Sequence, residues 1–306
     1  MLKYLVKRIG TAVITLFVAA TITFFVMNLV PGDPFMSEKA PTAAAKAAME
    51  AKYGLDKPLV VQYANYLKNL LHGDFGVSYV QAKNKPIMDI IKQAFPISAK
   101  IGAIAVVVAT VIGIPLGCLS ALRREKWQDN VIRVLSTVGI AVPGFVVATS
   151  FMILFAVKLK LVPASGLSSA AAYVLPVVTL ALSPCSYIAR LMRSSMLDVI
   201  GQDYIRTARA KGLPEWKVLG KHAMRNAILP VVTYIGPMFA ALITGSFVVE
   251  KVFGIPGIGN LFTNSILNRD YTLIMGITVF FSVILVICIL VVDILYVLID
   301  PRIKYQ

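Results

Sequence analysis

The sequence predicts an all-α, polytopic membrane protein with six transmembrane helices and both termini in the cytoplasm. Of its 306 residues, 58% are hydrophobic and only 15% are charged, and the mean hydropathy is +0.79. Soluble domains are nearer one half apolar and one quarter charged, so this composition excludes an ordinary soluble fold. Long uncharged runs give the number of helices, and the placement of Lys and Arg gives their direction.

Six runs are long enough to cross about 30 Å of hydrocarbon at about 1.5 Å per residue. They are residues 9–30, 101–122, 134–157, 173–189, 226–249 and 271–299. The 22-residue first run exceeds the roughly 7 to 15 apolar residues of a signal peptide, and no small-x-small cleavage site follows it. We therefore expect it to remain as a span. The last run is interrupted only by Asp293, for which helix packing is favoured over ion binding.

The basic residues predict which segments face the cytoplasm. With the N-terminus inside, seventeen of the 30 Lys and Arg residues fall on inner segments, eight of them between residues 190 and 225. The chain then divides into a cytoplasmic N-terminus with the first span (1–30), an extracytoplasmic helical segment (31–96) and a five-span domain (97–306) with a cytoplasmic loop at 190–229. The net charge of +15 serves this topology and attracts anionic membrane lipid, so nucleic acid is not an expected partner.

Two short helices are expected within the outer segment 31–96. In "PTAAAKAAMEAKYGL" Thr42 can cap a helix that Gly54 ends, and "DKPLVVQYANYLKNLLHG" predicts a second helix from Pro58 to Gly73. Its apolar residues recur at helical spacing; they are Leu59, Tyr63, Tyr66, Leu67 and Leu70. Two roles fit equally well, a docking platform for an extracellular partner and a lid that stabilises the bundle.

Candidate catalytic and metal-binding groups are scarce. The two histidines, His72 and His222, fall on opposite sides of the membrane, so neither an H-E-x-x-H motif nor an intramembrane Ser–His pair can form. The three cysteines lie in apolar runs without C-x-x-C spacing, which predicts neither a disulfide nor a metal site. Asp293 leaves an ion-coupled secondary carrier as a weak alternative. We expect no catalytic residue, no metal and no bound cofactor in this chain.

Residues 203–230, "DYIRTARAKGLPEWKVLGKHAMRNAILP", concentrate basic charge in the cytoplasmic loop. Asp203 can cap one helix, Gly212 can end it, and Pro214 suits the first position of a second helix. The pattern predicts a helix, a turn and a helix.

The second of these helices carries an apolar stripe in a basic surround. Trp216, Leu219 and Ala223 recur at spacings of three and four. A loop that only marks the inner side needs no stripe, and a DNA-binding helix-turn-helix is disfavoured because both ends are tethered to spans. The stripe and the turn favour a helix that docks into a groove of a cytoplasmic partner.

These residues carry a family resemblance. The stretch "TARAKGLPEWKVLGKHAMRNAILP" resembles the cytoplasmic loop of ATP-binding-cassette (ABC) importer permeases, in the form found in the oligopeptide, dipeptide and nickel branch. The sugar-importer form begins E-A-A and reaches its L-P sooner after the glycine. The stretches "MLKYLVKRIG", "EAKYGLDKPLVVQYANYLKNLLHGDFG", "FGIPGIGNLF" and "LNRDY" extend the resemblance along the whole chain, to the B-type oligopeptide permease subunit.

The resemblance implies a type I ABC importer permease fold in a bacterial cell membrane. It implies a non-catalytic subunit that forms half of a pathway for oligopeptides, with nickel or a nickel chelate as the alternative substrate. Its implied partners are a second, C-type permease subunit, two cytoplasmic ABC ATPases that bind ATP and Mg²⁺, and an extracellular peptide-binding protein.

The resemblance also assigns the ATPase contact to the cytoplasmic loop, whereas it leaves substrate-binding residues unassigned. The contact residues it implies are Tyr204, Arg206, Ala208, Arg209, Ala210, Lys211, Gly212, Leu213, Pro214, Glu215 and His222. Gly and Pro residues within the spans, Pro143 and Gly144 among them, are expected kink points for the rocking of such a permease.

The predicted topology is tested by thiol labelling of intact cells. In a background without native cysteines, Lys83→Cys and Ser168→Cys should react with an impermeant thiol reagent, because both positions are expected outside. Gln202→Cys should react only after lysis. Labelling of Gln202→Cys from outside would overturn the orientation.

Overall fold

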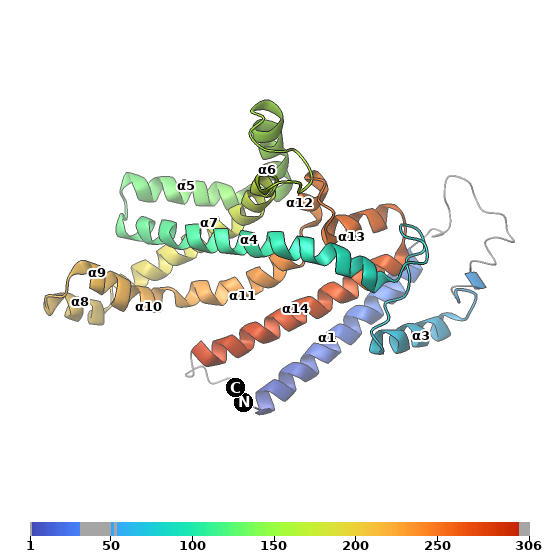
Figure 1. Cartoon of the computed structure of the whole chain (residues 1–306). Helices are drawn as coiled ribbons and strands as arrows, with labels where there is room; N and C mark the ends of the chain where they lie inside the picture. The colour runs from blue at the N-terminus through green and yellow to red at the C-terminus, as the bar shows by residue number, and fades with distance from the viewer. Residues whose placement is uncertain (1, 31–49, 52–53, 300–306) are drawn as a thin grey trace.

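The computed structural model of the chain describes residues 2–30, 50–51 and 54–299. Within these ranges the secondary structure is helical, with one isolated bridge between Val77 and Pro86, so the predicted all-α class is confirmed. Figure 1 shows an elongated bundle with α8 and α9 at one end and α3 and α13 at the other. The start of α1 and the end of α14 both point away from α3.

The helices are bounded as follows. They are α1 (Leu2–Leu29), α3 (Leu59–Leu71), α4 (Ile87–Leu122), α5 (Trp127–Ala141), α6 (Gly144–Phe151), η1 (Met152–Lys158), η2 (Ala170–Tyr173), α7 (Val174–Ile200), α8 (Asp203–Ala210), α9 (Glu215–Lys217), η3 (Val218–Ala223), α10 (Met224–Ala227), α11 (Leu229–Ile243), α12 (Phe247–Val252), α13 (Ile258–Leu267) and α14 (Tyr271–Ile299). In the described part of the chain, five segments are long and apolar enough to span a membrane, and the bent pair α5 and α6–η1 makes a sixth. Each predicted span falls on one of them.

Close packing of α4 on α7 forms the centre of the bundle. Gly113 and Gly117 of α4 face α7. A Cβ at Gly113 would lie 2.9 Å from the carbonyl oxygen of Cys185, and a Cβ at Gly117 would lie 2.5 Å from that of Ala189. Only glycine lets the two backbones approach this closely, as small residues do in membrane helix pairs. Ile188 and Met192 of α7 are fully buried against this face.

The third predicted span, 134–157, is not one helix. Its two halves, α5 and α6 with η1, meet at an angle of 104°. Val142 is extended (φ −77°, ψ 125°) because the residue before a proline is sterically disfavoured in the α conformation, and Pro143 then precedes the first turn of α6. The expected kink at Pro143 and Gly144 is confirmed, whereas a continuous helix across it was wrong.

Two expected boundaries fall inside helices, because charged residues lie on helices that continue beyond the uncharged runs. The 36-residue α4 begins at Ile87, so the expected domain boundary at 96/97 falls inside this helix. At about 1.5 Å per residue α4 is roughly 54 Å long, well beyond about 30 Å of hydrocarbon. Similarly, α7 continues to Ile200, so residues 190–200 of the expected loop belong to a helix.

The fifth candidate span, Leu229–Val252, contains α11 and the short helix α12, and a further unexpected helix, α13, follows it. The expected span 226–249 breaks where α11 ends and Gly245 adopts a φ of +90°. The buried carboxylate of Glu250 accepts hydrogen bonds from the backbone N–H groups of Gly259 (2.8 Å) and Asn260 (3.0 Å), and so satisfies the first turn of α13. The hydroxyl oxygen of Ser98, on α4, accepts another from the N–H of Ile258 at 2.9 Å.

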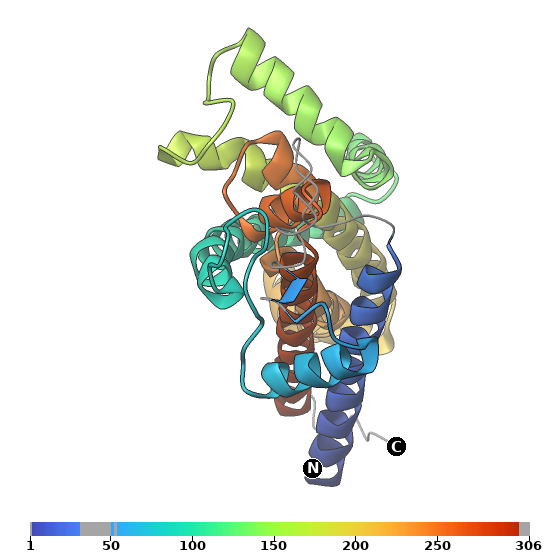
Figure 2. The same ribbon diagram turned by 90° about the vertical axis from the view of Figure 1, so that its right-hand side faces the viewer.

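Helix α3 confirms the second of the two expected outer helices. It follows Pro58 and ends before Gly73, which has a φ of +74°. The rings of Tyr63 and Tyr66 both lie 5.3 Å from that of Phe24, so α3 rests on the outer end of α1 (Figure 2). No residue of α3 is fully buried. The other expected helix, from Thr42, lies largely outside the described residues.

A buried carboxylate joins the outer segment to α14. Asp270 accepts hydrogen bonds from the hydroxyl of Ser78 (2.5 Å) and from the N–H groups of Val80 (3.1 Å) and Gln81 (3.0 Å). Its other oxygen accepts from the N–H of Leu273 (3.3 Å), which caps α14. The loop after α3 is therefore attached to the first turn of α14. Asp293 lies within α14, and its side chain is outside the described part of the chain.

Candidate functional site

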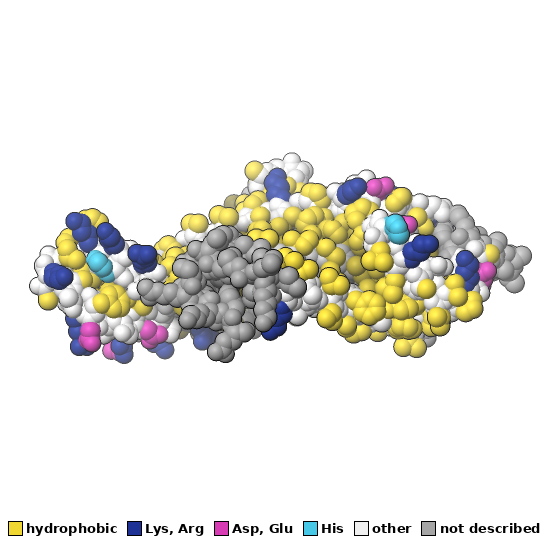
Figure 3. Space-filling view, turned by 90° about the horizontal axis from the view of Figure 1, so that it is seen from below, with side chains coloured by type: hydrophobic (Ala, Val, Ile, Leu, Met, Phe, Trp, Pro, Cys, Tyr) yellow, Lys and Arg dark blue, Asp and Glu magenta, His cyan; other side chains and the backbone are white. Residues whose placement is uncertain are grey.

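The basic loop between α7 and α11 projects from one end of the bundle, where Lys and Arg side chains gather (Figures 1 and 3). Helix α8 ends in a Schellman turn, in which Gly212 N–H donates to Arg209 O (2.9 Å) and Leu213 N–H donates to Ala208 O (3.4 Å). Gly212 has a φ of +72°, a conformation that L side chains rarely adopt. The expected helix, turn and helix are confirmed.

Two positions in this loop differ by one residue from the prediction. Asp203 is the first residue of α8 and Gln202 precedes it without a side-chain capping bond, so Asp203 is not the cap. Pro214 precedes α9 with an extended ψ of 144° rather than occupying its first helical position. Helix α8 therefore begins one residue earlier than predicted and α9 one residue later, which is the usual uncertainty at helix ends.

An ion pair spans the turn. The guanidinium of Arg209 donates to both carboxylate oxygens of Glu215, at 2.7 Å and 3.2 Å. This hydrogen bonding lowers the pKa of Glu215 and raises that of Arg209. Because the pKa of Glu215 is depressed, the pair stabilises the folded loop at any pH above the ordinary glutamate pKa. This stabilisation is lost only as the pH falls through the depressed value. The ion pair is therefore formed at neutral pH and holds α8 and α9 in a fixed relation.

The second helix of the loop contains a π-helical segment, and this changes which residues face inward. Between Val218 and Ala223 the chain forms η3, so these two buried residues, five apart, share the inner face with Ala227. The predicted docking stripe assumed 3.6 residues per turn and placed Trp216 on one face with Ala223, which is buried. Trp216 is instead 71% exposed, with Lys217 Nζ 5.3 Å from the centre of its ring.

Buried polar contacts hold the base of the loop. Arg193, near the end of α7, donates to both carboxylate oxygens of Asp129 at 2.7 Å, and the hydroxyl of Ser120 donates to the same carboxylate at 2.6 Å. Asp129 is fully buried, so removing either partner of this pair would cost about 3–5 kcal/mol. Within the loop, Asn226 Nδ2 donates to Tyr204 Oη at 2.8 Å.

The structure brings most of the expected contact residues onto one surface. Those exposed are Tyr204, Arg206, Arg209, Ala210, Lys211, Gly212, Pro214 and Glu215. Leu213 and His222 are half-buried, and Ala208 is buried, where it supports α8 rather than facing solvent. The exposed Trp216, which the predicted docking stripe included, joins this surface. Its place directly after Pro214 and Glu215, at the start of a helix, was the available signal that it could face outward.

Comparison with known proteins places this loop in a family. Residues 113–305 match the model of the binding-protein-dependent transport system inner membrane component, and residues 1–102 match the N-terminal model of such membrane components. The chain belongs to this permease family. Over 304 residues it is 46% identical to the dipeptide transport system permease protein DppB of Bacillus subtilis, covering 99% of this chain and 98% of the relative. It is 44% identical to the oligopeptide transport system permease protein OppB of Haemophilus influenzae, over the full length of both.

Solved structures share the permease fold. The inward-facing MetNI methionine ABC transporter superposes with a TM-score of 0.59 at 17% identity, covering 71% of this chain and 99% of that one. An amino acid ABC transporter superposes with a TM-score of 0.54 at 15% identity, covering 68% and 93%. The expected type I importer fold and the resemblance to the oligopeptide and dipeptide branch are both confirmed, and the permease is a multi-pass cell-membrane protein.

The turn at Gly212 allows a direct test. Gly212→Val should strain the left-handed position by about 1–2 kcal/mol, so the loop should open about 5 to 30 times more often. Chymotrypsin, which cuts at exposed Tyr204 and Trp216, should nick the purified permease faster by that factor.

Gly220→Val is the matched control for this prediction. Gly220 lies in the same loop, has open space where a Cβ would be and has no positive φ. Its substitution should leave the nicking rate within about twofold. Equal nicking of both variants would contradict the strain assigned to Gly212.

Proposed function

We propose that the chain is the permease subunit of an ATP-driven importer and forms half of the pathway for oligopeptides that an extracellular solute-binding protein delivers. The relatives that support this substrate class, 41–46% identical over nearly the whole chain, are named as dipeptide or oligopeptide permeases. The observation that carries the proposal is the rigid loop at one end of the bundle, which exposes Arg206, Lys211 and Trp216 together.

The loop is built to transmit a displacement. It follows α7 and leads into α11 through η3 and α10, so any movement of the loop acts on two membrane helices at once. The Schellman turn, the pair of Arg209 with Glu215 and the buried Ile205 and Val218 keep it in one shape. Seated in a cleft of a cytoplasmic ABC ATPase, it would move when the two ATPases close on ATP and Mg²⁺, and the helices would switch between inward- and outward-facing arrangements.

The proposed assembly has five further components of known type. A C-type permease subunit supplies the other half of the pathway, two ATPases bind the nucleotide and the metal, an extracellular protein captures the peptide, and membrane lipid surrounds the spans. This chain then hydrolyses nothing itself. Both termini and the loop lie on the cytoplasmic side, and α3 lies outside.

The function is tested by peptide-stimulated ATP hydrolysis of the complete transporter in lipid nanodiscs with its solute-binding protein. Oligopeptide should stimulate hydrolysis by the wild type. Trp216→Ala should lower the stimulated rate at least tenfold, because a buried tryptophan anchor commonly carries more than 2 kcal/mol of an interface.

Trp127→Ala provides the control, since Trp127 is also 71% exposed but begins α5. It should retain the wild-type rate. If peptide stimulated ATP hydrolysis by the Trp216→Ala protein as strongly as by the wild type, the proposed role of the loop would be wrong. If no peptide stimulated ATP hydrolysis by the wild-type complex, the proposed substrate class would be wrong.

A further inference from the structure

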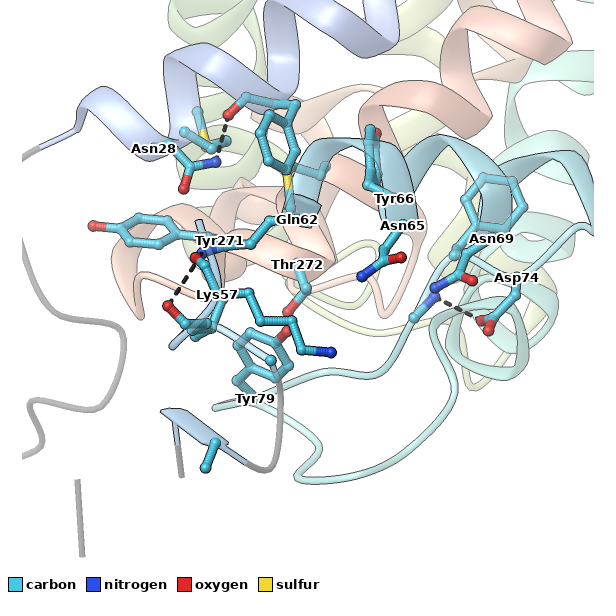
Figure 4. Close-up of a pocket in the computed structure, with 18 residues that line it drawn as sticks. Asn28, Lys57, Gln62, Asn65, Tyr66, Asn69, Asp74, Tyr79, Tyr271 and Thr272 are labelled. Carbon is cyan, nitrogen blue, oxygen red and sulfur yellow. Dashed lines mark hydrogen bonds between the residues drawn. The ribbon is translucent and has the colours of Figure 1, made fainter. Parts of the chain in front are cut away.

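The outer end of the bundle contains a cavity of about 430 Å³. Figure 4 shows it between the end of α1, one face of α3, the loop at residues 74–79 and the first turn of α14. Its volume lies within the range of about 300–1,000 Å³ that is typical of small-molecule sites. None of its walls belongs to the cytoplasmic loop.

One face of α3 directs hydrogen-bonding side chains at this cavity. Gln62, Asn65, Tyr66 and Asn69 all line it, at the i, i+3, i+4 and i+7 spacing that places residues on one side of a helix. The Nδ2 and Oδ1 atoms of Asn65 and Asn69 have no hydrogen-bond partner among the described residues, although each amide can donate twice and accept twice. This face therefore offers peptide-like groups to a ligand.

Two opposite charges border the same cavity. The side chain of Gln62 donates to the carbonyl oxygens of Leu55 (3.1 Å) and Lys57 (2.8 Å), which holds the turn that carries the Lys57 ammonium. Across the cavity, Asp74 Oδ1 accepts from the N–H of Gly76 at 2.8 Å, and its second oxygen remains open. Within the described ranges neither Lys57 nor Asp74 forms an ion pair.

Two tyrosine hydroxyls in the walls lack partners. The Oη atoms of Tyr66 and Tyr271 are both buried and make no hydrogen bond. Burial raises the pKa of Tyr66, so its hydroxyl keeps its proton and remains a donor at neutral pH. Unpaired buried hydroxyls are costly and call for a polar partner. Because both oxygens are closed to solvent, they lie behind the wall of the cavity, and the open groups that line it are the side chains of α3, Lys57 and Asp74.

The balance of charges selects the class of ligand. Among the described lining residues, one carboxylate is too few for a cation site, and one lysine beside an aspartate does not suit a phosphate. A ligand that carries an ammonium group, a carboxylate group and amides between them can pair with both charges and with the two asparagine amides. The apolar walls, among them Phe24, Met27 and Met275, are suited to its side chains.

We propose that this outer pocket binds a short peptide in its zwitterionic form. Asp74 accepts from the terminal ammonium, Lys57 donates to the terminal carboxylate, and Asn65 and Asn69 pair with the peptide units. Asp270 acts as a positioning residue, because it ties the loop that contributes Tyr79 to the turn that contributes Thr272. The inference rests on the proposed peptide transport and adds a receiving site on the permease itself.

The test measures binding of trialanine to the complete transporter in nanodiscs, without its solute-binding protein, by isothermal titration calorimetry. Wild type should bind saturably. Lys57→Met and Asp74→Asn should each weaken binding at least tenfold, whereas Tyr66→Phe, which removes only an oxygen closed to the cavity, should stay within twofold of wild type. Lys68→Met and Asp56→Asn lie on the same segment but do not line the pocket, so they should stay within twofold of wild type.

Blocked peptides identify which end of the ligand each charge meets. N-acetyl-trialanine should bind weakly to wild type and no more weakly to Asp74→Asn, because the acetyl group already removes the contact between the terminal ammonium and Asp74. Trialanine amide should likewise bind weakly to wild type and no more weakly to Lys57→Met, because the contact between the terminal carboxylate and Lys57 is already absent. Loss of affinity that is equal for blocked and free peptides in both variants would overturn the assignment of the charges.

Two further outcomes would overturn the pocket while leaving peptide transport intact. One is the absence of saturable trialanine binding in a transporter whose ATP hydrolysis is normally stimulated by loaded solute-binding protein. The other is weaker capture of the solute-binding protein by Lys57→Met and Asp74→Asn at unchanged trialanine affinity, which would make this a protein-docking surface. Failure of peptide to stimulate the complete system would instead count against the proposed function.

Discussion

The contact between α4 and α7 is the constraint on which the rest of the molecule depends. At Gly113 and Gly117 the backbone of α4 packs directly against α7. A Cβ at either position would collide with backbone and side-chain atoms of α7. In lipid, association of helices relies on such van der Waals fit, because the surrounding hydrocarbon is as apolar as the helices. Helix α4 then reaches the end of the bundle that carries α3 at Ile87, and α7 reaches the end that carries α8 at Ile200.

Each end of this central pair is fixed by a carboxylate with several hydrogen-bond donors. At the end near α8, Asp129 joins the start of α5 to the end of α7 through Arg193. At the end near α3, Asp270 joins the loop after α3 to α14, and Glu250 joins α12 to the first turn of α13, which Ser98 attaches to α4. Buried carboxylates are costly unless fully paired, so these contacts define single arrangements at the two ends where partners would act.

Much of this architecture is predictable from sequence, and the failures have physical causes. Uncharged length identified the membrane segments, and positive-φ glycines such as Gly212 marked helix ends. The uncharged run 101–122 placed the start of α4 too late, because the helix continues past the hydrocarbon and includes charged residues. A 3.6-residue period wrongly put Ala223 on the exposed face with Trp216, because η3 winds more loosely. The outer pocket was not predictable, since its walls come from four segments that only the fold brings together.

The central claim is that the loop around Gly212 seats in the ATPase, and cross-linking tests it most directly. Lys211→Cys, in a transporter otherwise free of cysteines in this chain, should be joined by a short bifunctional thiol reagent to a cysteine in the ATPase cleft. Ser168→Cys, exposed in the connection before α7, should not be joined. A cross-link that forms from Lys211→Cys and changes in yield with ATP is the predicted result. Its absence in an assembled, ATP-hydrolysing transporter would contradict the account.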